Sequence, residues 1–185
     1  DYWNVIRHGL SLDMTTAGYL TVLPLLILIA STWTKKWALR KWMRPYLILI
    51  GTIMAIIFIV DTALYTFWGF KLDATVFNYL DSPSEAFASV SIGFITARIF
   101  GIVAVAFFFS WIFIHLTPKK LCTCHHRIST TLLLLFMGGG LFLIIRGGIT
   151  ESTSNIGQVY FSDRQFLNHS AVNPCFSLLS SMGKS

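Results

Sequence analysis

The chain has 185 residues, of which 55% are hydrophobic and only 12% are charged. A soluble domain carries about 25% charged residues, so this composition leaves too little polar surface for a water-soluble protein. The net charge of +6 at pH 7 comes largely from two short basic loops. It therefore requires no nucleic-acid partner and suits anionic lipid head groups.

Four apolar blocks are long enough to cross a membrane. A span needs about 20 predominantly apolar residues, and such blocks occur at about 14–33, 46–68, 92–116 and 128–145. No water is available in lipid to satisfy backbone N–H and C=O groups, so each block should be a helix. We predict an all-α polytopic membrane bundle of about four transmembrane helices, with a transmembrane domain over 1–146.

Lysine and arginine in the loops predict the orientation. Two loops are basic and contain no acidic residue, with Lys35, Lys36, Arg40, Lys41 and Arg44 in the first and Lys119, Lys120 and Arg127 in the second. Basic loops stay in the cytoplasm. Residues 1–13, 69–91 and 147–185 are then expected outside.

Both ends of the chain suggest a longer protein. Residue 1 is expected outside, yet no signal peptide precedes it, so we expect an upstream span. The tail over 147–185 is expected to be a juxtamembrane linker toward a catalytic domain absent from this chain. Its apolar residues predict two short amphipathic helices around 162–182, lying in the outer interface.

Charged residues near the membrane are the candidate site. Arg98 falls about 9 Å into the third span, where an unpaired arginine is costly. It either pairs with Asp61, which lies at a similar depth, snorkels to the interface, or binds a lipid phosphate. Arg146 and Arg7 are the other candidates for lipid head-group binding, because guanidinium binds phosphate in a bidentate way. Arg146 is alternatively an interfacial anchor.

Two further features have more than one interpretation. Gly138-Gly139-Gly140 favours close packing against another span, although a hinge is the alternative. The CTCHH sequence at 122–126 brings together four metal-ligand side chains. Adjacent positions do not readily close a tetrahedral site, so we expect no metal site and interpret the segment as an ordinary cytoplasmic loop.

The expected outer segments resemble a known family. The stretch DTALYTFWGFKLDATVFNYLDSPSEAFASVS at 61–91 is similar to the segment after the third span of lipoteichoic-acid-synthase-like proteins, in the alkaline phosphatase superfamily. The tail, with RGG, VYFS, FLNHSAVNP and FSLLSS in order, resembles that family's juxtamembrane stretch, and RHGLSLD at 7–13 resembles the lead into its second span.

The resemblance implies a bacterial inner-membrane anchor followed by an extracytoplasmic catalytic domain. In this family that domain holds a divalent metal, often manganese, and a threonine nucleophile that transfers or hydrolyses a lipid head group. The chain itself then has no catalytic residue and no cofactor, and its partners are membrane lipids and its own downstream domain. The alternatives are a membrane sensor or interaction domain with a non-catalytic ectodomain and, ranked last, a small transporter subunit. The sequence does not determine the oligomeric state.

Overall fold

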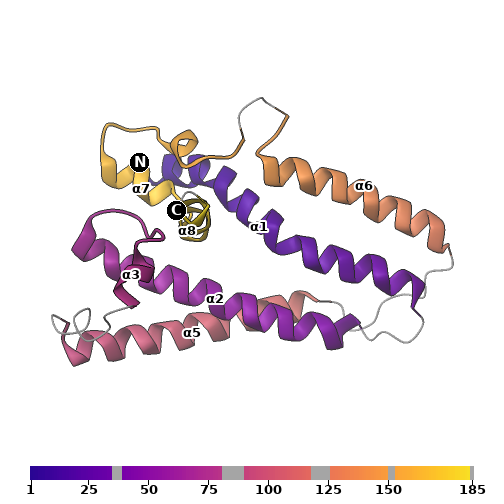
Figure 1. Cartoon of the computed structure of the whole chain (residues 1–185), viewed down its shortest axis with the longest axis horizontal. Helices are drawn as coiled ribbons and strands as arrows, with labels where there is room; N and C mark the ends of the chain where they lie inside the picture. Colours follow the sequence, from indigo (N-terminus) through magenta and orange to yellow (C-terminus); the bar gives the residue numbers. More distant parts are fainter. Residues whose placement is uncertain (35–38, 81–89, 118–125, 150–152, 184–185) are drawn as a thin grey trace.

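The structure is a computed structural model that describes residues 1–34, 39–80, 90–117, 126–149 and 153–183. Within these ranges every regular element is a helix (Figure 1). The long helices are α1 (Tyr2–Trp33), α2 (Leu39–Trp68), α5 (Ile92–Leu116) and α6 (Arg127–Arg146). The short ones are α3 (Val76–Leu80), the 3-10 helix η1 (Ile156–Val159), α7 (Gln165–Ala171) and α8 (Pro174–Met182). The predicted all-α bundle is confirmed, as are short helices in the tail.

The four long helices are those that the composition predicted as membrane spans. All four are long and apolar enough to cross a bilayer, over Tyr2–Trp33, Lys41–Trp68, Ile92–Leu116 and Arg127–Arg146. Neither α5 nor α6 has a buried residue. Even large apolar side chains on them are exposed, such as Phe100 at 76% and Phe136 at 80%. Apolar surface on this scale is not left facing water. The chain is therefore a multi-pass helical membrane protein.

Local chemistry determines where the third and fourth long helices begin and end. The Ser91 side chain accepts a hydrogen bond from the Phe94 N–H at 3.3 Å and caps α5. Helix α6 stops after Arg146 because Gly147 has φ +90°, a left-handed conformation that glycine adopts without strain. The N–H groups of Gly147 and Gly148 both bond to the Leu143 carbonyl, at 3.1 and 2.9 Å.

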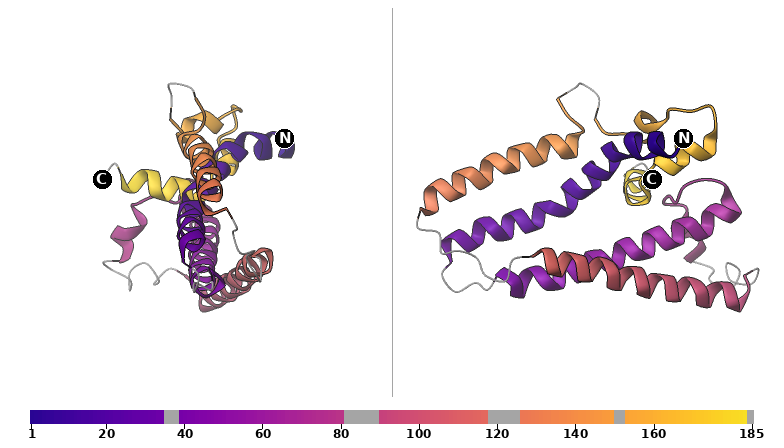
Figure 2. Two further views of the ribbon diagram at one scale, coloured as in Figure 1. Left: turned by 90° about the vertical axis from the view of Figure 1, so that its right-hand side faces the viewer. Right: turned by 180° about the vertical axis from the view of Figure 1, so that it is seen from behind.

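The long helices pack as two pairs, α1 with α6 and α2 with α5 (Figures 1 and 2). Glycine permits the close approach in each pair. A Cβ atom added to Gly18 of α1 would lie 2.9 Å from Ile145 of α6. One added to Gly51 of α2 would lie 3.0 Å from the Ser110 hydroxyl of α5.

The glycine triplet contributes to packing at one of its three positions. A Cβ on Gly138 would lie 3.3 Å from Leu25 of α1, whereas one on Gly139 or Gly140 would meet nothing within 4 Å. The close packing predicted for this segment therefore holds for Gly138, and the other two glycines lie on an open face of α6.

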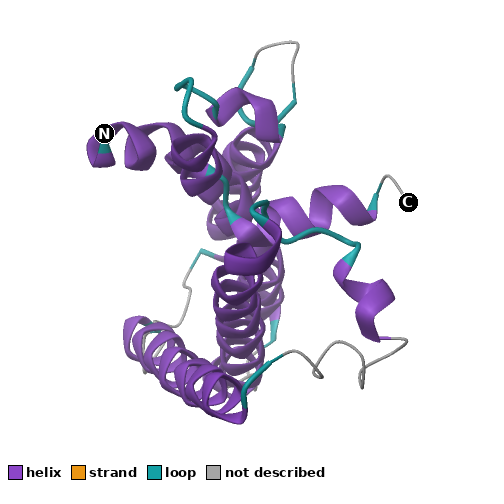
Figure 3. Cartoon of the chain, turned by 90° about the vertical axis from the view of Figure 1, so that its left-hand side faces the viewer, coloured by secondary structure: helices purple, strands orange, loops and turns teal. Residues whose placement is uncertain are grey.

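Helix α1 begins well before the predicted start of its span. Its first turns, from Tyr2 onward, run across the long axis of the bundle instead of along it (Figure 2, left, and Figure 3). Within α1, Thr16 donates a hydrogen bond to the carbonyl of Leu12 at 2.8 Å, and Pro24 lies further along the same helix. Threonine bonded in this way to the preceding turn often bends a helix.

The tail packs onto these first turns. Leu12 of α1 and Val159 of η1 are completely buried and form a core with Ala171 and Val172. Gly9 lies so near α7 that an added Cβ would be 2.8 Å from the carbonyl oxygen of Ala171. Residues on both sides of position 146, where we expect the transmembrane domain to end, therefore contribute to this core.

The tail also lies between the two helix pairs at one end of the molecule. Helices α7 and α8 contact α1, and α8 contacts α2 as well, so the yellow segments lie between α1 and α2 in Figure 1. We call this end, formed by the start of α1, the end of α2, the start of α5, the end of α6 and the tail, the tail end.

Candidate functional site

The tail end contains a pocket of about 760 Å³ between α1, α6 and α8, which we call the Arg146 pocket. Its polar lining residues are Thr15, Thr16, Tyr19, Arg146, Thr153, Ser154 and Ser180. Its apolar lining residues are Phe142, Ile145, Phe176 and Leu179. One cation, several hydroxyls and an apolar wall are the features that suit an amphipathic ligand with an anionic head.

The chain turn after α6 builds the rim of this pocket. Gly147 and Gly148 reverse the chain, and the Ser154 N–H then bonds to the Arg146 carbonyl at 3.0 Å. The Thr15 hydroxyl donates to the Ile144 carbonyl at 3.2 Å and lies 2.9 Å from the Ser154 hydroxyl. The RGG sequence therefore fixes Arg146 beside α1 at the end of its helix.

A buried ion pair lies under the tail at the end of α2. Asp61 is 4% exposed, and its carboxylate accepts hydrogen bonds from the Lys71 ammonium at 2.5 Å and the Leu72 N–H at 2.9 Å. A buried charge of this kind is tolerated only when it is paired and its remaining oxygen is bonded. Gly69, with φ +68°, provides the turn that returns Lys71 to α2.

His169 connects α7 to the same part of α2. Its Nδ1 lies 3.2 Å from the Tyr65 hydroxyl, and the residue is 7% exposed. Burial lowers the pKa of His169, and the nearby Lys71 charge lowers it further. The neutral ring is therefore favoured, and its Nδ1 can accept the hydrogen bond from Tyr65.

Asparagines fix the path of the tail. The Asn168 side-chain oxygen accepts the N–H groups of Phe161 and Ser162, both at 2.9 Å. Asn173 caps α8 by accepting the Cys175 N–H at 2.9 Å, and its amide donates to Asp13 of α1 at 2.6 Å. In this structure, residues of the FLNHSAVNP sequence thus hold the tail against α1 and α2.

Arg98 does not form the ion pair that was one of its expected roles. Lys71 takes the place opposite Asp61, while the Arg98 guanidinium lies over the ring of Phe94 on its own helix, 4.7 Å from the centroid. Asp61–Lys71 is the one carboxylate–cation contact within 4 Å among the described residues. The structure therefore corrects the pairing of Asp61 from Arg98 to Lys71.

The three arginines proposed for lipid binding are not gathered in one place. Arg146 lines the pocket, whereas Arg7 and Arg98 do not. Arg7 is exposed on the first turns of α1, and Arg98 is half-buried near the start of α5. The geometry thus singles out Arg146 as the arginine that faces a cavity.

Cysteine and metal-ligand residues offer no assembled centre within the described part of the chain. Cys175 is a free, buried thiol, and burial raises its pKa to about 11. No three His, Cys, Asp or Glu side chains among the described residues could share a metal ion. Cys122, Cys124 and His125 lie outside the described residues. The manganese implied by the family resemblance thus has no ligand group in this part of the chain.

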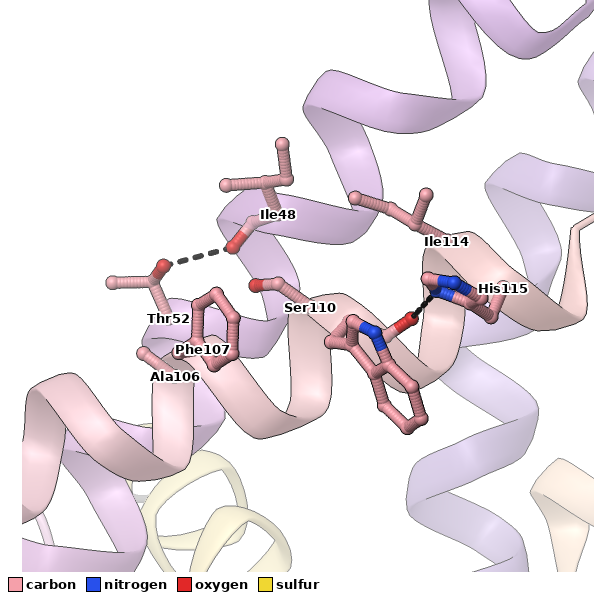
Figure 4. A pocket seen from close by; sticks show the side chains of 8 residues that line it. Ile48, Thr52, Ala106, Phe107, Ser110, Ile114 and His115 are labelled. Carbon is pink, nitrogen blue, oxygen red and sulfur yellow. Dashed lines mark hydrogen bonds between the residues drawn. The ribbon is translucent and has the colours of Figure 1, made fainter.

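A second hollow, of about 430 Å³, lies between α2 and α5 away from the tail (Figure 4). Its wall is mostly apolar, from Ile48, Phe107, Trp111 and Ile114. Thr52 and His115 bond to carbonyls of their own helices, at 2.8 and 2.9 Å. No acidic residue, lysine or arginine lines it, so it has the character of a lipid-facing groove.

Comparisons with known proteins do not add a relative: no family model, curated protein or solved structure matches this chain. What the structure defines is the class, a multi-pass helical membrane protein with an ordered tail packed on its helices. Any finer function must be argued from the tail end.

Sequence reasoning missed the residues that hold this end together. Thr15, Lys71, Ser154 and Asn173 were not candidates. Asn-Pro at 173–174 was an available signal, because Asn is a preferred helix cap and Pro is favoured in the first helical turn. The hydroxyl pair of Thr15 and Ser154 had no local signal, since 139 residues separate them.

Proposed function

We propose that this chain is the membrane anchor and lipid-presenting domain of a lipoteichoic-acid-synthase-like phosphoglycerol or phosphoethanolamine transferase, or of a related sulfatase-family hydrolase. The observation that carries the proposal is the Arg146 pocket, which combines a guanidinium with hydroxyls and an apolar wall. The phosphate of a membrane lipid would lie at Arg146, in the bidentate geometry that guanidinium favours. Its acyl part would lie against Phe142, Ile145 and Leu179.

The position of the pocket supports this reading. It lies beside α8, the last described helix, so a lipid bound there would be close to whatever follows the tail. The positive-inside rule assigns this end to the outer leaflet. A catalytic domain following the tail would then meet the head group of the lipid at the membrane surface.

The seating of the tail favours a second candidate, a membrane sensor or interaction domain. The tail is bonded to α1 through Asn173 and to α2 through His169, so a shift between the helix pairs would reach whatever follows α8. The two functions differ in the downstream domain. A threonine nucleophile with Asp, Glu and His metal ligands there identifies the transferase or hydrolase, and their loss identifies the sensor.

Lipid binding by purified protein tests the proposal. The full chain in mild detergent is mixed with equal amounts of phosphatidylglycerol and phosphatidylcholine, and bound lipids are counted by native mass spectrometry. Losing a hydrogen bond to a charged group costs about 1.5–3 kcal/mol, so Arg146→Gln should weaken phosphatidylglycerol retention about tenfold or more.

Arg127→Gln is the matched control, because it removes the same charge from the opposite end of α6. It should leave phosphatidylglycerol retention unchanged. If both variants lose the lipid equally, retention depends on overall charge and the proposed site is wrong.

A further inference from the structure

The first turns of α1 carry an apolar stripe that the described parts of the chain leave uncovered. Tyr2, Ile6 and Leu10 are 88%, 60% and 54% exposed, and Trp3 beside them is 73% exposed. Residues four apart lie on one face of a helix. The same series continues at Met14, which is 47% exposed and begins the predicted span.

A neighbouring face of these turns is already occupied. Val5 packs against the core of the tail, Leu12 is completely buried in it, and Gly9 lies against α7. The tail therefore fixes the direction of the segment, and the stripe lies beside that contact on the exposed part of the helix.

The segment lies in the plane where a membrane surface would be. It crosses the long axis of the bundle at the tail end (Figure 2, left, and Figure 3), while the rest of α1 and the helices α2, α5 and α6 run along that axis (Figure 1). Because it continues directly into the span of α1, its height is that of the boundary between hydrocarbon and water.

We infer that residues 2–10 of α1 form an interfacial anchor whose Tyr2, Trp3, Ile6 and Leu10 insert into the lipid leaflet at the tail end. Tyr and Trp prefer this depth, where the ring is apolar and the polar atom remains hydrated. Arg7, exposed beside the stripe, can reach lipid phosphates from there. The anchor would hold the core of Leu12 and Val159, and so the tail, at a fixed height over the membrane.

The inference does not depend on the Arg146 pocket. If no lipid binds at Arg146, the stripe can still insert into the membrane. If the stripe proves to lie in water, the Arg146 pocket can still bind a lipid. The bilayer is preferred over a protein partner because the stripe is continuous with a membrane span and begins with a Tyr-Trp pair.

Spin-label accessibility tests the inference on the full chain in vesicles of phosphatidylcholine and phosphatidylglycerol. Cys122→Ser and Cys124→Ser remove the two thiols that lie outside the described residues, and buried Cys175 is retained. Nitroxides are attached at Ile6→Cys and Leu10→Cys, with Asp163→Cys, exposed in a polar turn of the tail, as the control. The ratio of oxygen to nickel-chelate collisions should be at least about threefold higher at 6 and 10 than at 163, as for a face inserted at the interface.

Two results would overturn the anchor. Collision ratios at 6 and 10 equal to that at 163 would place the stripe in water. Exclusion of both reagents would mean that protein, either a second copy or another segment, covers it.

A second measurement requires no cysteine change. Lipids brominated near the head group should quench the tryptophan emission that is lost in Trp3→Phe, obtained as the difference between wild type and variant. An unquenched difference spectrum would contradict insertion.

Discussion

Asp61 is bonded at both of its carboxylate oxygens, one to Lys71 and the other to the Leu72 N–H. The sequence predicted an ion pair between Asp61 and Arg98 from their similar depth, and it did not offer Lys71 as a partner. The structure pairs Asp61 with Lys71 instead. Lys71 reaches Asp61 because the turn at Gly69 returns the chain to α2. Arg98 does not reach it, because its guanidinium lies over the ring of Phe94 on its own helix.

Removing one partner of this pair should strongly destabilise the tail end. Asp61→Ala leaves the Lys71 ammonium, whose side chain is 14% exposed, without its counter-charge. A broken buried pair costs about 3–5 kcal/mol, so the melting temperature of the detergent-solubilised chain should fall clearly. Lys71→Ala should have a similar effect, and the double variant should lose much less than the sum.

Arg98→Ala is the control for this cycle. Its guanidinium makes no contact with Asp61, so the effects of Asp61→Ala and Arg98→Ala should add. Additivity between Asp61 and Lys71, together with coupling between Asp61 and Arg98, would reverse the assignment that the structure makes.

At the scale of elements, the long helices were predictable and their mutual contacts were not. Length and apolar content determine a membrane helix, because lipid allows almost no other backbone structure. The predicted third span, 92–116, has the bounds of α5. The start of α1 was missed because its first turns are stabilised by the tail, through Leu12 and Val159, and no local pattern encodes that contact.

The tail shows the same division between local and long-range information. Apolar spacing correctly predicted short helices near α7 and α8. The burial of His169, Asn173 and Cys175 depends on contacts with α1 and α2, more than 100 residues away in the chain. Of the residues that line the Arg146 pocket, the sequence predicted only Arg146, as an arginine at the end of a span.

The pairing of α2 with α5 yields a prediction about glycine. In Gly51→Ala the added Cβ would lie 3.2 Å from the Ser110 backbone nitrogen, which cannot move aside alone. Overpacking of this kind costs about 1–3 kcal/mol, so the variant should unfold at a lower temperature in detergent.

Gly139→Ala is the matched control, because its Cβ meets nothing within 4 Å. Alanine is the better helix former by about 1 kcal/mol, so this variant should be as stable as wild type or slightly more stable. Equal destabilisation at Gly51 and Gly139 would show that helix contacts are not what Gly51 provides.

At the scale of the whole molecule, two helix pairs are joined by the tail. The contacts between the pairs α1–α6 and α2–α5 are far fewer than the contacts within each pair. Helices α7 and α8 lie between the pairs at the tail end (Figure 1). This end carries the Arg146 pocket, the Asp61–Lys71 pair and the exposed stripe of α1. The opposite end carries the described basic residues Lys41 and Arg44, near the start of α2, and Arg127, at the start of α6. The predicted orientation and the architecture therefore divide the molecule in the same direction.

That division predicts which end faces the outside of the cell, and an impermeant thiol reagent can test it. Wild-type protein in intact cells should not react, because Cys122 and Cys124 lie in a basic loop expected in the cytoplasm. Cys175 is buried, with its pKa raised to about 11, so little of the reactive thiolate forms near neutral pH.

Adding one thiol at each end makes the test decisive. Asp163→Cys, exposed on the tail, should react in intact cells. Thr34→Cys, exposed at the opposite end of α1, should react only after the membrane is permeabilised. Labelling of Thr34→Cys but not Asp163→Cys in intact cells would invert the topology. It would also place the Arg146 pocket in the cytoplasmic leaflet, where it could not present lipid to an external domain.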